Sequence, residues 1–83
     1  MKIELTKSEF ELLVKNNILS NRIDFIDNDD SILISSSLKG FEILLDNLGD
    51  LIAEKGIGNN GEINHFGIRI EKIIDKISDT IWG

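Results

Sequence analysis

Two short segments contain residue types that bind phosphate or metal ions, but each pattern is incomplete. The segment 56–61 reads G-x-G-x-x-G and precedes a predicted helix, an arrangement in which backbone N–H groups hold a pyrophosphate. A dinucleotide site needs a strand before this loop, whereas a helix is predicted here, and Glu62 adds a negative charge beside the phosphate position. The segment therefore indicates a flexible turn between two helices.

The acidic segment that begins at Asp27 resembles the start of a calcium loop, since oxygen ligands at alternate positions converge on a hard cation. Counted from Asp27, however, the sixth position holds Ile32 where the loop requires Gly, and the twelfth holds Leu38 where it requires Glu. A solvated hairpin turn accounts for these residues better. The sequence predicts no bound metal ion and no cofactor.

The single histidine, His65, lacks the partners that a metal ligand or a catalytic base needs. The chain has no cysteine, and Arg69 occupies the position four residues further along, where a second helical ligand belongs. A general base also needs a nucleophile and an orienting group within reach. We therefore predict that His65 is an exposed residue or makes a local hydrogen bond, and that the protein is not an enzyme.

One charge pattern stands out from the rest of the sequence. Acidic residues occupy every fourth position of a helix predicted over residues 38–55, namely Glu42, Asp46, Asp50 and Glu54. We call these four residues the acidic row. At 100° per residue they lie roughly opposite the apolar stripe of the helix, and Ile43 projects into the same surface. Neighbouring members repel each other by about 0.2–0.5 kcal/mol. The last three have no Lys or Arg three or four residues away.

Three interpretations of the acidic row remain open from the sequence. It can be a solvated surface with one exposed isoleucine, since single exposed apolar side chains are normal. It can pair with basic residues of the last helix, Arg69, Lys72 or Lys76. It can also be a docking surface for a basic partner, because rows of acids accelerate encounter with basic proteins.

Local patterns predict the first half of the fold. Alternating apolar residues predict a strand over 1–5. Thr6 and Glu9 fit a capping box that starts a helix ending at Asn16–Asn17. Two β-branched or aromatic runs, 22–27 and 31–36, flank a turn-forming segment and predict a β-hairpin.

Helical periodicity predicts the second half. One helix covers 38–55 and is followed by Gly56 in a left-handed position. Gly49 leaves open whether this helix is divided. A second helix covers 63–81. Eighty-three residues allow one domain, spanning 1–83. The β-α-β-β-α-α order predicts a small two-layer α+β domain with a three-stranded sheet and helices packed on one face.

Charge and composition limit the kinds of partner. Fifteen acids against nine bases give a net charge of −6, which repels nucleic acid and anionic lipid. No apolar run approaches the roughly 20 residues of a spanning helix. We therefore predict no nucleic-acid partner, no membrane partner, and a basic or neutral protein partner. The N-terminus, Met1-Lys2-Ile3-Glu4, is unlike a secretion signal and favours the cytoplasm. Abundant Ile, Asn and Lys with one Ala and no Pro are typical of AT-rich coding and indicate a bacterial source.

The sequence thus favours a non-catalytic protein-binding module of the inhibitor or immunity-protein type. In that hypothesis, the acidic row and Ile43 contact the partner and mask a basic site on it. The alternative is a structural or oligomerisation module that dimerises through its C-terminal helix. Ile68 lies off the apolar stripe and Trp82 lies close to the helix end. These two residues are either a second layer of the core or the candidate contacts of the dimer. A monomer and a homodimer are both compatible with the sequence.

Overall fold

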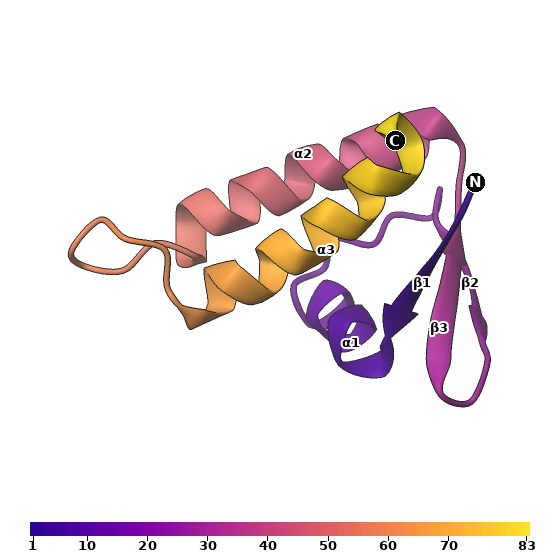
Figure 1. Ribbon diagram of the computed structural model, residues 1–83, viewed down its shortest axis with the longest axis horizontal. Helices are drawn as coiled ribbons and strands as arrows, with labels where there is room; N and C mark the ends of the chain where they lie inside the picture. Colours follow the sequence, from indigo (N-terminus) through magenta and orange to yellow (C-terminus); the bar gives the residue numbers. More distant parts are fainter.

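The computed structural model describes residues 1–83 and contains the six predicted elements in the predicted order (Figure 1). They are β1 (Lys2–Thr6), α1 (Lys7–Lys15), β2 (Asp24–Asp27), β3 (Ser31–Ser35), α2 (Leu38–Lys55) and α3 (His65–Trp82). The α+β fold class is confirmed. Boundaries agree with the sequence prediction to within two residues, because most element ends are marked by caps or turns.

The sheet is antiparallel throughout, with the strand order β1-β3-β2. Ile3 of β1 lies opposite Ile34 of β3, and both are buried beneath the helices. Helices α1 and α3 pack against the sheet, and α2 packs along α3. Figure 1 shows the three helices on the same side of the sheet. The predicted two-layer arrangement is therefore confirmed.

The hairpin is present but shorter than the predicted segments 22–27 and 31–36. Ile23 lies outside β2 because its N–H donates to the carbonyl of Ser20 at 3.1 Å instead of joining the ladder. It is nevertheless buried. The turn places Asp29 in the left-handed region, with φ of 69°, a conformation that Asp adopts more readily than most residues.

Helix α1 begins with the predicted capping box. The Glu9 N–H donates to Thr6 Oγ1 at 3.1 Å, and the Thr6 N–H donates to Glu9 Oε1 at 2.8 Å. These two bonds satisfy N–H groups that the first helical turn otherwise leaves unpaired. The helix ends at Asn16, and Asn17 has a φ of 55°. The predicted end at Asn16–Asn17 is confirmed.

Helix α2 runs without interruption through Gly49, but the predicted conformation of Gly56 is wrong. Gly56 has φ of −90° and ψ of −3°, which is right-handed. Glycine is needed here for space, since a Cβ at Gly56 would lie 3.0 Å from the Cα of Gly67. The two bare backbones allow the end of α2 to approach the start of α3 closely.

Helix α3 begins two residues later than predicted because Asn64 is its N-cap. The Gly67 N–H donates to Asn64 Oδ1 at 2.8 Å, while Asn64 Nδ2 donates to the carbonyl of Lys55 at 2.8 Å. Asn64 therefore ties together the facing ends of α2 and α3. Ile63 lies outside the helix and pairs with Ile57 in an isolated β-bridge. The connecting turn, predicted to be flexible, is held by this bridge.

The core contains fourteen buried apolar side chains from the sheet, the three helices and the segment before β2. The apolar stripes predicted for the two long helices supply half of it: Phe41, Leu44, Leu48, Leu51, Ile70, Ile73 and Ile77. No charged or polar side chain is buried. None of the helices combines the length and apolar character needed to cross a membrane.

Candidate functional site

The acidic row lies along the side of α2 that faces away from the core. Asp46, Asp50 and Glu54 are exposed, and Glu42 is half-buried. The neighbouring apolar residues Leu44, Leu48 and Leu51 point inward and are buried. Because the core fixes the rotation of α2 about its own axis, burial of this stripe forces the acidic row outward.

No basic side chain of the chain neutralises the acidic row. The structure contains two side-chain ion pairs, Lys7–Asp27 at 3.6 Å and Lys76–Glu9 at 2.6 Å. None of the four carboxylates of the row accepts a side-chain hydrogen bond. The interpretation in which α3 supplies the missing cations is therefore wrong.

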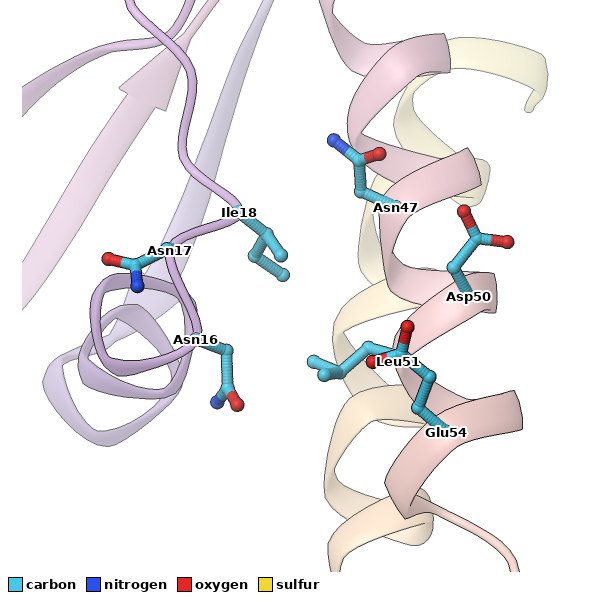
Figure 2. Close-up of a pocket in the computed structure, with 7 residues that line it drawn as sticks. All are labelled: Asn16, Asn17, Ile18, Asn47, Asp50, Leu51 and Glu54. Carbon is cyan, nitrogen blue, oxygen red and sulfur yellow. The ribbon is translucent and has the colours of Figure 1, made fainter.

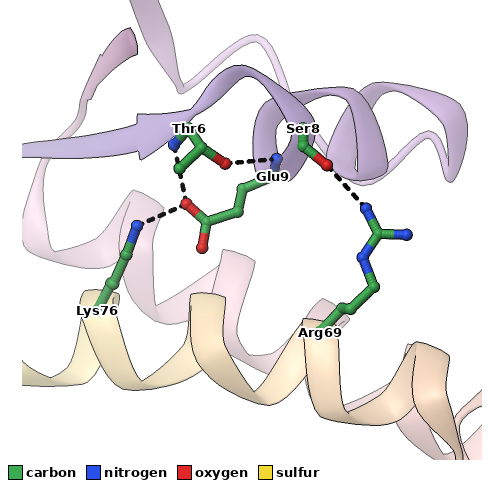
Figure 3. Close-up of polar contacts among 5 residues, drawn as sticks. All are labelled: Thr6, Ser8, Glu9, Arg69 and Lys76. Carbon is green, nitrogen blue, oxygen red and sulfur yellow. Dashed lines mark hydrogen bonds and ion pairs between the residues drawn. The ribbon is translucent and has the colours of Figure 1, made fainter.

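Two of the three basic residues of α3, Arg69 and Lys76, are turned toward α1 instead (Figure 3). Lys76 Nζ donates to Glu9 Oε1, and Arg69 donates to Ser8 Oγ at 2.8 Å. Lys72 forms no ion pair. Figure 3 shows Arg69 and Lys76 reaching from α3 to the first turn of α1, so neither side chain reaches α2.

Glu9 occupies the centre of this polar cluster. Its side chain is only 15% exposed, and burial by itself raises the pKa of a carboxyl group. The hydrogen bonds from Lys76 and Thr6 and the charge of Lys76 outweigh that effect and hold the pKa of Glu9 below its usual value. Glu9 is therefore ionised at neutral pH and joins α1 to α3.

The C-terminal half of the acidic row borders an open hollow of about 280 Å³ between α2 and the end of α1 (Figure 2). The lining combines two carboxylates, three amides and two apolar side chains. These are Asp50, Glu54, Asn16, Asn17, Asn47, Ile18 and Leu51. Figure 2 shows Ile18 and Leu51 extending into the space from opposite sides.

This hollow suits a cationic side chain that has an apolar stem. The carboxylates of Asp50 and Glu54 can accept charge-assisted hydrogen bonds, and Ile18 and Leu51 offer apolar surface for the methylene groups of Lys or Arg. Lys55 reaches the edge of this hollow, where its Nζ donates to Asn16 Oδ1 at 3.3 Å, but it forms no ion pair with Asp50 or Glu54.

The sequence did not identify the α1 side of this hollow. From the sequence, Asn16 and Asn17 indicate only the end of a helix, and no spacing in the chain relates them to Asp50. The two segments meet only because α1 and α2 share one core. The sole sequence signal is the pair of adjacent asparagines, which favours a turn but does not indicate what lies across from it.

The other candidate contact residues are dispersed. Ile43 is half-buried and is not among the side chains packed on the core. Ile68 is 42% exposed and Trp82 is 64% exposed, so neither is tucked into the core. They lie fourteen positions apart on α3, which is about 21 Å along the axis. The intervening exposed surface is charged, so the two do not form one apolar patch.

The remaining sequence patterns do not join the acidic row. His65 is exposed at the first position of α3. Asp27 Oδ1 accepts the Asp29 N–H at 2.9 Å, and the Gly58 N–H donates to the carbonyl of Glu62 at 2.7 Å. The acidic segment that begins at Asp27 and the glycine-rich segment 56–61 thus each form a hydrogen-bonded turn. No group of three or more His, Cys, Asp or Glu side chains is arranged to hold a metal ion.

Comparison of the chain with protein-family models, with curated proteins and with solved structures gives no match.

Proposed function

We propose that the protein is a non-catalytic protein-binding domain of the inhibitor or immunity-protein type. In this proposal the acidic row, together with Ile43, contacts a basic surface of a partner protein in the bacterial cytoplasm. The observation that carries the proposal is that no carboxylate of the row forms an ion pair within the chain, although the four are regularly spaced and three of them are exposed. A basic partner supplies the missing charges.

The physical mechanism is electrostatic attraction followed by local insertion. A net charge of −6 and a one-sided row of carboxylates accelerate the encounter with a positively charged surface, and salt weakens this effect. The hollow beside Asp50 and Glu54 then accommodates a Lys or Arg side chain of the partner. Ile43 adds apolar contact next to the charged positions.

The energetics of the free protein support this proposal. The row contains three adjacent acid pairs, which together destabilise α2 by about 0.6–1.5 kcal/mol. One Lys at a central position would turn two of these repulsions into attractions. Binding a basic surface offsets the same repulsion, so this destabilisation of α2 is relieved in the complex.

The test compares two pairs of charge reversals with identical spacing. A partner captured from the native cell in low salt is purified, and its association is measured by stopped flow. Asp46→Lys with Asp50→Lys should slow association by about tenfold at low salt, with a smaller change in dissociation. Glu71→Lys with Asp75→Lys makes the same change in net charge on α3 and serves as the control. Equal association rates for the two double variants would refute the docking surface.

A second candidate, self-association through α3, is favoured by the exposure of Trp82. Large aromatic side chains are enriched in interfaces, and 64% of Trp82 is exposed. This candidate predicts a dimer that Trp82→Ala or Ile68→Asp dissociates. Sedimentation equilibrium over a range of protein concentrations tests it, and a monomer at all concentrations excludes it.

A further inference from the structure

The edge of the sheet at β2 is open. All four residues of β2 are exposed, which holds for no other element. Helices α1 and α3 pack against β1 at the opposite edge, and no helix backbone approaches β2. Figure 1 shows β2 at the outer margin of the sheet. Phe25 and Ile26 are each 57% exposed.

The backbone of β2 offers hydrogen bonds to an additional strand. The Asn28 N–H bonds to the carbonyl of Ser31 at the turn. Because bonding alternates along an antiparallel pair, Ile26 and Asp24 also face β3. The N–H and C=O groups of Phe25 and Asp27 therefore point to the open edge. None of them appears in the hydrogen bonds made outside the sheet.

The side chains of β2 extend both faces of the sheet. Phe25 lies opposite Ile34 on the helix-covered face, and its ring centroid is 4.8 Å from that of Phe10. Ile26 lies opposite Leu33 on the bare face. An added strand would find an apolar surface on each side, at Phe25 on one face and at Ile26 on the other.

Charge determines which residue the added strand needs at one end. Asp24 is exposed and forms no side-chain ion pair. Asp27 already contacts Lys7 at 3.6 Å and the N–H of Asp29. Lys2 and Arg22 border the same open hollow as Asp24 but form no ion pair with it. A base opposite Asp24 therefore gains a carboxylate that no ion pair occupies, whereas the position opposite Asp27 has no such requirement.

A second copy of this chain fits the edge poorly. If Phe25 pairs with its own copy, Asp24 lies opposite Ile26, an acid against an apolar side chain. The neighbouring registers that preserve the hydrogen bonds place either Asp24 opposite its own copy or Phe25 opposite Asp27. Every such register therefore juxtaposes an acid with another acid or with an apolar group, and both are unfavourable.

We propose that β2 binds an extended segment of a partner protein as a fourth, antiparallel strand. The segment carries two adjacent apolar residues opposite Ile26 and Phe25, followed by Lys or Arg opposite Asp24. This recognition combines main-chain hydrogen bonds with side-chain complementarity, as in other cases of strand addition. It is independent of the acidic row, which lies on a different element.

The test uses a capped peptide with a central Val-Ile-Lys flanked by threonines, titrated into the ¹⁵N-labelled full chain. The expected result is slowed amide exchange at Phe25 and Asp27. N-methylation of the isoleucine, which lies opposite Phe25, should weaken binding by roughly twofold to tenfold, the range for one lost hydrogen bond. N-methylation of the valine should have less effect, because its N–H points away from β2.

A charge exchange tests the role of Asp24. Asp24→Lys should weaken binding of the lysine peptide by roughly twofold to fivefold, as expected for an exposed ion pair. A peptide with Glu in place of Lys should recover binding to this variant. Asp75→Lys is the control with the same change in net charge, and it should leave the affinity unchanged.

Several results would overturn the proposal. Equal affinities of the two N-methylated peptides exclude pairing along the strand, and equal affinities of the lysine and glutamate peptides exclude the role of Asp24. Protection of Phe25 and Asp27 that increases with protein concentration without peptide identifies a second copy as the occupant. Chemical-shift changes confined to α2 place binding on the acidic row instead. None of these results affects the kinetic test with Asp46 and Asp50.

Discussion

Neutralising one central member of the acidic row should stabilise the free protein. Asp46 has Glu42 and Asp50 four residues away on either side and no base three or four residues away. It also lies midway along α2, where the helix dipole has little effect. Asp46→Asn keeps the shape and helix propensity similar. Removing two repulsions of about 0.2–0.5 kcal/mol each predicts a gain of about 0.4–1 kcal/mol in the free energy of unfolding.

Urea denaturation at low salt followed by circular dichroism measures this gain. For a domain of this size, 1 kcal/mol corresponds to about 4–8 °C in Tm, so thermal unfolding gives a second readout. The gain should disappear in about 1 M salt, because the Debye length falls to about 3 Å. Asp46→Asn also separates self-repulsion within the row from partner binding, since no partner is present.

Glu11 provides a control with the opposite expected sign. It is exposed on α1 with Lys7 and Lys15 four residues away on either side. Glu11→Gln should therefore lose about 0.4–1 kcal/mol in the free energy of unfolding at low salt. If Asp46→Asn is neutral or destabilising while Glu11→Gln behaves as expected, a cation already neutralises the acidic row. The electrostatic reasoning for the docking surface would then be refuted.

Three further predictions concern the contacts that hold the helices in place. Gly67→Ala should destabilise the fold by about 1–3 kcal/mol, because its Cβ would lie 2.5 Å from the carbonyl oxygen of Gly56. Gly49→Ala, whose Cβ would have nothing within 4 Å, should stabilise the fold by about 0.5–1 kcal/mol. Urea denaturation measures both changes, and two changes of the same sign would contradict this pair of expectations. Asn64→Ala should destabilise the fold by about 1–2 kcal/mol, because the helix cap and the hydrogen bond to Lys55 are lost. Faster exchange of the Gly67 amide without a loss of stability would contradict the role of Asn64 in joining α2 to α3. Because the pKa of Glu9 is lowered, its carboxylate stabilises the fold above the unfolded-state pKa, and this contribution is lost as the pH falls through the folded-state pKa. The difference in stability between the wild type and Glu9→Gln should therefore shrink in acid. A difference that does not depend on pH would contradict the role given to the Glu9 carboxylate.

Most of the fold was predictable because its signals are local. The capping box of Thr6 and Glu9, the asparagines at the end of α1 and the turn between β2 and β3 each involve residues only a few positions apart. Burial of the two long apolar stripes follows from helical periodicity alone. These agreeing local signals define the element order, and the order then leaves few ways to cover one face of a three-stranded sheet.

The features that the sequence did not show depend on distant residues that meet in space. Gly56 was expected to need a left-handed conformation, but its lack of a side chain serves the approach of Gly67 instead. The side chain of Asn64 reaches back to the carbonyl of Lys55, a contact that no sequence spacing predicts. The hollow beside Asp50 likewise forms only because the fold places the end of α1 across from α2. Periodicity determines which face of a helix is buried, but not what lies beside the exposed face.

The distribution of bases explains why the acidic row differs from other acids of the chain. On α3, acids also recur at every fourth position, but lysines lie between them: Glu71, Lys72, Asp75, Lys76 and Asp79. On α2, the only bases are Lys39 and Lys55, near the two ends. Lys55 donates to Asn16 on α1, so the middle of α2 keeps its negative charge. Although α2 and α3 have equal length and similar acid content, the electrostatic field of α2 is therefore more negative than that of α3.

This asymmetry constrains how a basic partner can approach. Bases and acids balance on α1 and on α3, where Arg69 and Lys76 are bound to the first turn of α1. Negative charge remains on the outer side of α2. Among the three helices, a positively charged surface is therefore attracted most strongly to α2, so the field favours an encounter there before contact. The same separation predicts that charge reversal on α2 slows association more than an equal reversal on α3.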